Sequence, residues 1–101
     1  MLQRITLDVH GHWDDKPPVY RIYVNNDLLT ERTFGWPQYK IFIRENMVCY
    51  LEPGIHKLRI ENVTGYGRFI VDNLTVEGRT DALHPNHGIE PNGEVLTFIV
   101  N

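Results

Sequence analysis

The chain has 101 residues, of which 42% are hydrophobic and 23% are charged, and its formal net charge is -3. This length fits one domain, because a hydrophobic core closes with about 100 to 150 residues. The composition is near the average for soluble globular proteins and far from that of disordered chains. We therefore expect a single folded domain over residues 1–101.

Residue usage favours strands over helices. Val, Ile and Leu occur nine times each and Thr seven times, whereas Ala occurs once and Ser is absent. Residues that are β-branched or large and apolar fit a pleated, half-buried surface. We expect an all-β protein.

Charge and cysteine usage narrow the classes of partner. The seven arginines are dispersed along the chain, whereas a nucleic-acid surface gathers basic residues on one face, so we expect no nucleic-acid partner. The single cysteine, Cys49, excludes an intrachain disulfide and is expected to be a small buried hydrophobe. The N-terminus shows neither a signal peptide nor a membrane span, so we expect synthesis in the cytoplasm and no membrane contact.

Apolar and polar residues alternate with a period of two, the pattern of a half-buried strand, at spacings of about ten residues. Turn residues such as Asn25–Asp27 and Glu52–Gly54 separate the alternating segments. The predicted strands are Arg4–Val9, Val19–Asn25, Leu28–Phe34, Tyr39–Arg44, Met47–Leu51, His56–Asn62, Arg68–Val76 and Glu94–Val100.

Seven or eight such strands, without a helical stripe or an internal repeat, predict an antiparallel β-sandwich, with a closed barrel as the alternative. We place a polar break at Glu45–Asn46, between two separate strands. The long connections Gly11–Pro18 and Glu77–Asn92 suit the crossing links of a Greek key or jelly roll.

The final strand is apolar on both faces, at Val95, Leu96, Phe98, Ile99 and Val100. Such a strand is either a core strand, which we place next to the first strand, or part of a contact between subunits, because an uncovered apolar strand invites edge pairing.

Histidines and acids in loops are candidate metal ligands. His10 and His12 end the first strand, and no helix fixes the spacing of these or of the later histidines. The acidic loop residues suit calcium, although their spacing does not match an EF-hand. We expect no cofactor and keep calcium as the alternative. The candidate ligands are Asp14, Asp15, His84, His87 and Glu90, and Asp81 provides a further carboxylate.

No pattern predicts catalysis. The absence of serine excludes a serine triad, and no glycine-rich phosphate loop is present. Asp14 and Glu31 could act as the carboxylate pair of a glycosidase if they faced each other across a cleft. A chain of this length offers little depth for a substrate cleft. We expect no enzymatic activity.

Aromatic residues in or next to turns are the candidate binding residues: Trp13, Trp36, Tyr39 and Tyr66. A ring in such a place stacks on a sugar or fills a pocket on another protein. For Trp36, which lies between Gly35 and Pro37, the alternative is a structural role as a cap on one end of the core.

Two resemblances follow from longer segments. Leu51–Asn62 and Phe69–Val76 resemble the late strands of carbohydrate-binding-module-like jelly rolls, which implies a jelly-roll fold and a sugar site formed by an acidic loop and exposed aromatics. Trp13, Asp14 and Asp15 are the loose counterparts of that site. Arg21–Phe34, with Tyr39 and Ile43–Asn46, resembles small structural proteins of tailed bacteriophages.

The phage resemblance implies a non-catalytic virion component, a capsid decoration, cement or fibre subunit made in the host cytoplasm. Its partners would be shell proteins or copies of itself, bound through loops and an edge strand. The alternative is a carbohydrate-binding module, in which an aromatic ring stacks on the sugar and a nearby Asp or Asn forms hydrogen bonds with the sugar hydroxyls.

Overall fold

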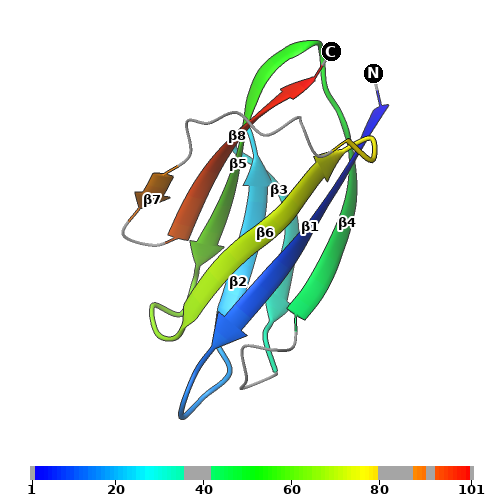
Figure 1. Ribbon diagram of the computed structural model, residues 1–101. Helices are drawn as coiled ribbons and strands as arrows, with labels where there is room; N and C mark the ends of the chain where they lie inside the picture. The colour runs from blue at the N-terminus through cyan, green and yellow to red at the C-terminus, as the bar shows by residue number, and fades with distance from the viewer. Residues whose placement is uncertain (1, 36–41, 80–87, 91–92, 101) are drawn as a thin grey trace.

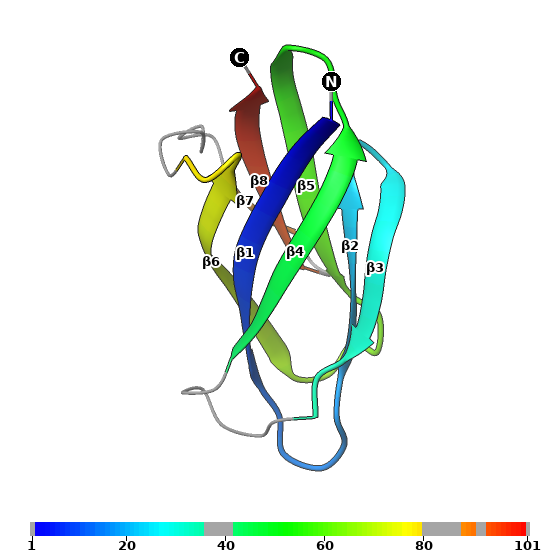
Figure 2. The ribbon, with the colours of Figure 1, turned by 90° about the vertical axis from the view of Figure 1, so that its right-hand side faces the viewer.

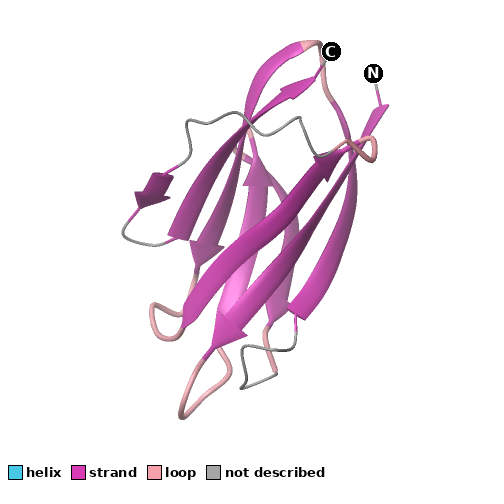
Figure 3. Cartoon of the chain, in the orientation of Figure 1, coloured by secondary structure: helices cyan, strands magenta, loops and turns pink. Residues whose placement is uncertain are grey.

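The computed structural model describes residues 2–35, 42–79, 88–90 and 93–100. These residues form eight strands and no helix (Figures 1 and 3). The strands are β1 (Leu2–His12), β2 (Val19–Val24), β3 (Asp27–Thr33), β4 (Phe42–Tyr50), β5 (Gly54–Asn62), β6 (Arg68–Val76), β7 (Gly88–Glu90) and β8 (Gly93–Val100).

The strands make two antiparallel sheets that face each other. A three-stranded sheet has the order β4-β1-β6, and a five-stranded sheet has the order β3-β2-β5-β8-β7. Figure 2 shows the two layers from the side. β1 and β4 pair with each other in one sheet, and the two strands between them in sequence, β2 and β3, pair in the other sheet. This connectivity is of the Greek-key type. The predicted β-sandwich is confirmed.

Alternating residues of the strands fill the space between the sheets, as their period of two requires. In β1 the inward set is Ile5, Leu7 and Val9, and in β2 it is Tyr20, Ile22 and Val24. The inward apolar side chains of the other strands come mainly from β5, β6 and β8: Leu58, Ile60, Leu74, Val76, Leu96, Phe98 and Val100. Cys49, which we predicted to be buried, is half-buried and packs against this core, and burial raises the pKa of its thiol.

The polar break predicted at Glu45–Asn46 is wrong, because β4 runs through it without interruption. The Glu45 side chain points inward and is only 2% exposed. Its two oxygens accept hydrogen bonds of 2.8 Å from the Arg32 guanidinium, and Glu45 Oε2 also accepts one of 2.6 Å from the Tyr20 hydroxyl. A carboxylate can therefore lie on the core-facing side of β4, because Arg32 neutralises its charge and both of its oxygens accept hydrogen bonds.

Two predictions for the C-terminal part need correction. The connection Glu77–Asn92 contains a short strand, β7, which pairs with β8. The last strand does not lie next to β1. It lies between β5 and β7, with Leu96, Phe98 and Val100 in the core and Val95 and Ile99 half-buried on the outer face. The strand is therefore a core strand, but of the other sheet.

Candidate binding surfaces

A pocket lies at the end of the sandwich where the β1–β2 and β5–β6 connections meet, which we call the loop pocket. It has a volume of about 570 Å³. It is lined by His12, Trp13, Asp14, Asp15, Lys16, Tyr66, Gly67 and Arg68. The first connection is shorter than predicted, since Gly11 and His12 belong to β1.

Asn62, at the end of β5, organises the loop that carries Tyr66. Its Oδ1 accepts hydrogen bonds from the Gly65 N–H at 3.1 Å and the Thr64 hydroxyl at 3.2 Å. Its Nδ2 lies 3.1 Å from the Tyr66 carbonyl oxygen and 3.3 Å from that of Gly67. One amide side chain thus fixes the turn at both of its ends.

The two connections are also held against each other. The Tyr66 hydroxyl donates a hydrogen bond of 3.4 Å to the Pro17 carbonyl oxygen. Gly67 has a φ of 77°, and a Cβ there would lie 3.0 Å from both Pro18 Cγ and the His12 carbonyl oxygen. Only glycine combines this backbone conformation with so close an approach. These two contacts hold the β1–β2 and β5–β6 connections together at the loop pocket.

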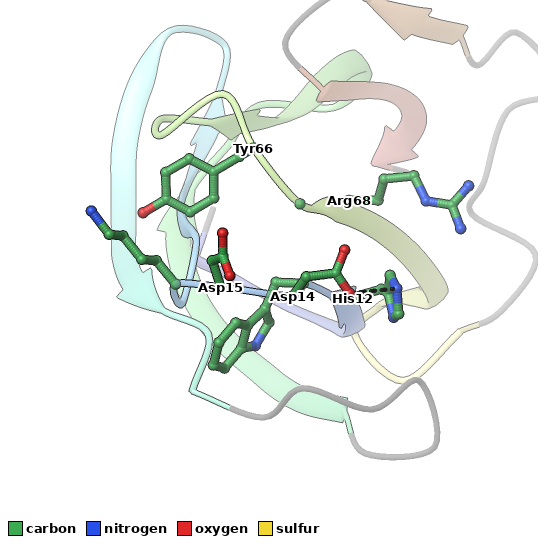
Figure 4. A pocket seen from close by; sticks show the side chains of 8 residues that line it. His12, Asp14, Asp15, Tyr66 and Arg68 are labelled. Atoms are coloured by element: carbon green, nitrogen blue, oxygen red, sulfur yellow. Dashed lines mark ion pairs between the residues drawn. The ribbon is translucent and has the colours of Figure 1, made fainter.

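The loop pocket combines aromatic surface with both signs of charge. Trp13 packs partly against the core, and Tyr66 is exposed. In Figure 4 the Asp15 carboxylate lies between the Tyr66 ring and Asp14, whereas Arg68 extends away from them. Because Asp14 and Asp15 are accompanied by Lys16 and Arg68, the lining suits a neutral ligand with hydroxyl groups better than an ion.

A second surface is the outer face of the three-stranded sheet. At one end Leu2 pairs with Tyr50 across β1 and β4, and Val48 follows on the same face. At the other end His10 pairs with both Phe42 and Ile70, in a row across all three strands. We call this surface, defined by the exposed side chains of Leu2, Phe42, Val48, Tyr50 and Ile70, the apolar face.

A polar cluster separates the two ends of the apolar face. Arg44 Nε donates a hydrogen bond of 2.8 Å to Asp8 Oδ1, and Asn73 Nδ2 donates one of 2.9 Å to Asp8 Oδ2. Asn73 has a φ of 54° and lies at a register shift between β1 and β6. The Arg44 hydrogen bond lowers the pKa of Asp8, which is buried although it lies on the outer side of its sheet.

The structure brings together only part of the predicted site. Trp13 and Tyr66, with Asp14 and Asp15, line one pocket although Trp13 and Tyr66 lie on different connections. Trp36, Tyr39, Asp81, His84 and His87 lie outside the described residues, as does the side chain of Glu90. Within the described part of the chain, no three His, Cys, Asp or Glu side chains are grouped to hold a metal ion. The calcium site therefore stays a prediction.

The apolar face was missed by sequence reasoning. Its signal is present, because β4 has apolar residues at Phe42, Val48 and Tyr50 on the face opposite to Ile43 and Met47. Because we predicted a break at Glu45–Asn46, Phe42 was assigned to a different strand from Val48 and Tyr50, and the alternation that places all three on one face was not recognised. A single strand drawn through the break would have placed them on one outer face.

No protein-family model matches this chain, and neither the curated proteins nor the solved structures gave a match to it. Within the residues that the structure describes, there is no helix of the length and hydrophobicity that crossing a membrane requires. The resemblances to phage structural proteins and to carbohydrate-binding modules therefore stay predictions.

Proposed function

We propose that this protein is a non-catalytic structural protein of a virion, a decoration, cement or fibre subunit that binds neighbouring protein subunits. We place the contact on the apolar face and take a second copy of the chain as its first partner. The virion as location rests on the sequence resemblance alone. The observation that supports protein docking is the gathering of five exposed apolar side chains on one outer sheet face.

The arrangement of the apolar face suits a two-fold contact. Its apolar groups lie at both ends, with Asp8, Arg44 and Asn73 between them. In a two-fold dimer the same patch is used by both copies, so each apolar end meets an apolar end of the partner when the axis runs along or across the strands. The polar centre would then meet a polar centre. A protein interface usually has an apolar centre and a polar rim. The interface proposed here would instead have two apolar contacts with a polar contact between them.

Light scattering coupled to size-exclusion chromatography, over a range of protein concentrations, tests this proposal. The wild-type chain is expected to gain molar mass as concentration rises, and Val48→Lys is expected to remain monomeric. Leu28→Lys is a matched control, because Leu28 is 52% exposed on β3 and Val48 is 50% exposed on β4. A wild-type monomer at every concentration, or equal effects of the two variants, would contradict the proposal.

A second candidate function is sugar binding at the loop pocket. It is favoured by the placement of Trp13 and Tyr66 beside Asp14 and Asp15, because rings stack on the C–H faces of pyranoses and carboxylates accept hydrogen bonds from hydroxyls. A glycan array, read with and without a calcium chelator, tests it. Tyr66→Ala is expected to abolish a hit, and Tyr50→Ala, which removes an exposed tyrosine outside the pocket, is expected to leave it unchanged. No hit on the array would contradict this candidate.

A further inference from the structure

The outer face of the five-stranded sheet carries a second hollow, on the layer opposite to the apolar face. It has a volume of about 510 Å³ and is lined by Tyr23, Asn25, Asn26, Lys57, Arg59 and Val95. Lys57 and Arg59 are its cations, and no carboxylate of the described residues lines it. We call it the cationic hollow.

The strands fix the floor of the cationic hollow. Tyr23, Arg59 and Val95 are cross-strand neighbours in one row over β2, β5 and β8. The Arg59 guanidinium carbon lies 4.4 Å from the centre of the Tyr23 ring, so the ring supports one face of the cation. This stacking limits the rotamers of Arg59 and holds its guanidinium in the lining of the hollow.

The turn between β2 and β3 fixes the wall. Asn25 and Asn26 both have positive φ, 50° and 77°, as a two-residue hairpin turn requires. The Asn25 side chain is used internally, because its Oδ1 accepts a hydrogen bond of 3.1 Å from the Lys57 N–H and its Nδ2 lies 2.7 Å from His56 Nδ1. The neighbouring Asn26 amide is exposed and makes no hydrogen bond to the described residues.

On the outer face of the five-stranded sheet, the ion pairs between described residues leave Lys57 without a carboxylate partner. Glu31 pairs with Arg21, and Glu61 Oε2 lies 3.7 Å from Arg59 Nη1. Glu61 Oε1 also accepts a hydrogen bond of 3.2 Å from the Tyr23 hydroxyl. The ammonium of Lys57 pairs with no carboxylate of the described residues. The cationic hollow therefore suits a ligand with a single carboxylate beside neutral polar groups.

We propose that the cationic hollow binds an acidic sugar residue, a hexuronate, through Lys57, Arg59 and the Asn26 amide. The carboxylate would accept from Lys57 and Arg59, while Asn26 would bond to a ring hydroxyl and Val95 would contact the C–H face. A sugar is favoured over an acidic peptide because β5 is paired on both sides in the middle of the sheet. A peptide gains most from an unpaired strand edge, which this site does not offer.

Isothermal titration with an oligogalacturonate and with its methyl ester tests the proposal, because the ester removes only the charge of the carboxylates. We expect the acid to bind, and the ester to bind roughly tenfold more weakly, since charge-assisted hydrogen bonds are lost. An oligoglutamate of similar length is the peptide arm and is expected not to bind. Equal binding of acid and ester, no binding of the acid, or binding of the peptide alone would overturn the proposal.

Variants locate the site. Lys57→Gln is expected to weaken binding of the acid roughly tenfold, and Asn26→Gly about threefold. Glycine is compatible with the φ of 77° at Asn26, so this change removes the amide without straining the turn. Arg4→Gln, which removes one positive charge from the outer face of the three-stranded sheet, is the control and is expected to leave binding unchanged. An unchanged affinity of Lys57→Gln, or an equal loss in Arg4→Gln, would exclude this site.

Discussion

The hydroxyl of Tyr20 donates a hydrogen bond of 2.6 Å to Glu45 Oε2, which joins β2 of one sheet to β4 of the other. Tyr20 is fully buried. Burial, and to a smaller extent the hydrogen bond with Glu45, raises the pKa of its phenol, so the hydroxyl keeps its proton and remains the donor. The Arg32 guanidinium, from β3, donates hydrogen bonds to both oxygens of the same carboxylate. This cluster connects three strands at one edge of the sandwich.

Replacing Tyr20 by phenylalanine should therefore destabilise the fold. The variant removes one hydrogen bond to a buried carboxylate, and we expect the free energy of unfolding to fall by about 1.5 to 3 kcal/mol. Tyr23→Phe is a matched control, because its hydroxyl bonds to the partly exposed Glu61. Urea denaturation of both variants measures the difference. An equal loss in the two variants would contradict a special role for the buried hydrogen bond.

Asp8 makes stability depend on pH in the acid range. Its pKa is lowered from the ordinary 3.8 in the folded state, chiefly by the hydrogen bond from Arg44, so the unfolded chain binds a proton more readily. The stabilisation is present above the ordinary value and is lost as the pH falls through the lower native value. We expect wild type to exceed Asp8→Asn in stability near neutral pH and the gap to narrow below about pH 4.

Thermal unfolding of both proteins across this pH range checks the sign of the effect. Asp15→Asn serves as the control, because Asp15 is an exposed loop carboxylate. Its difference from wild type is expected to stay small at every pH. A gap between wild type and Asp8→Asn that widens towards acid would show that the linkage has the opposite sign.

Gly11 leaves room for an aromatic cluster. A Cβ at Gly11 would lie 2.8 Å from Phe34 Cδ1, and Phe34 is fully buried with its ring centre 6.0 Å from that of Phe69. Gly11→Ala should therefore lower the free energy of unfolding by about 1 to 3 kcal/mol through overpacking. Gly35→Ala meets no atom within 4 Å and is the control. Calorimetric unfolding would refute the packing argument if the two variants had the same midpoint.

The inward faces of most strands were predictable from alternation alone. Ile22 and Leu58 could be placed in the core because a half-buried strand repeats every two residues. Glu45 could not, since the partners that neutralise it, Arg32 and Tyr20, lie 13 and 25 residues away in sequence. In the sequence alone, a charged residue with no nearby partner predicts the end of a strand. Only the tertiary structure shows the partners that allow the strand to continue.

The candidate site was predictable as residue types but not as a place. Trp13 and Tyr66 were identified because rings in turns suggest recognition, yet their meeting depends on which two connections share an end of the sandwich. That order is decided by long-range pairing, which also put β8 beside β5 instead of β1. The apolar face and the cationic hollow likewise combine residues from separate strands.

Isotope-filtered NMR on a mixture of labelled and unlabelled chains tests the central claim most directly, because it detects only contacts between copies. The account predicts intermolecular contacts from the methyl groups of Val48 and Ile70 on the apolar face. Intermolecular contacts confined to Leu28 and Ile55 on the five-stranded sheet, or no intermolecular contacts at the highest concentration of the light-scattering series, would contradict it.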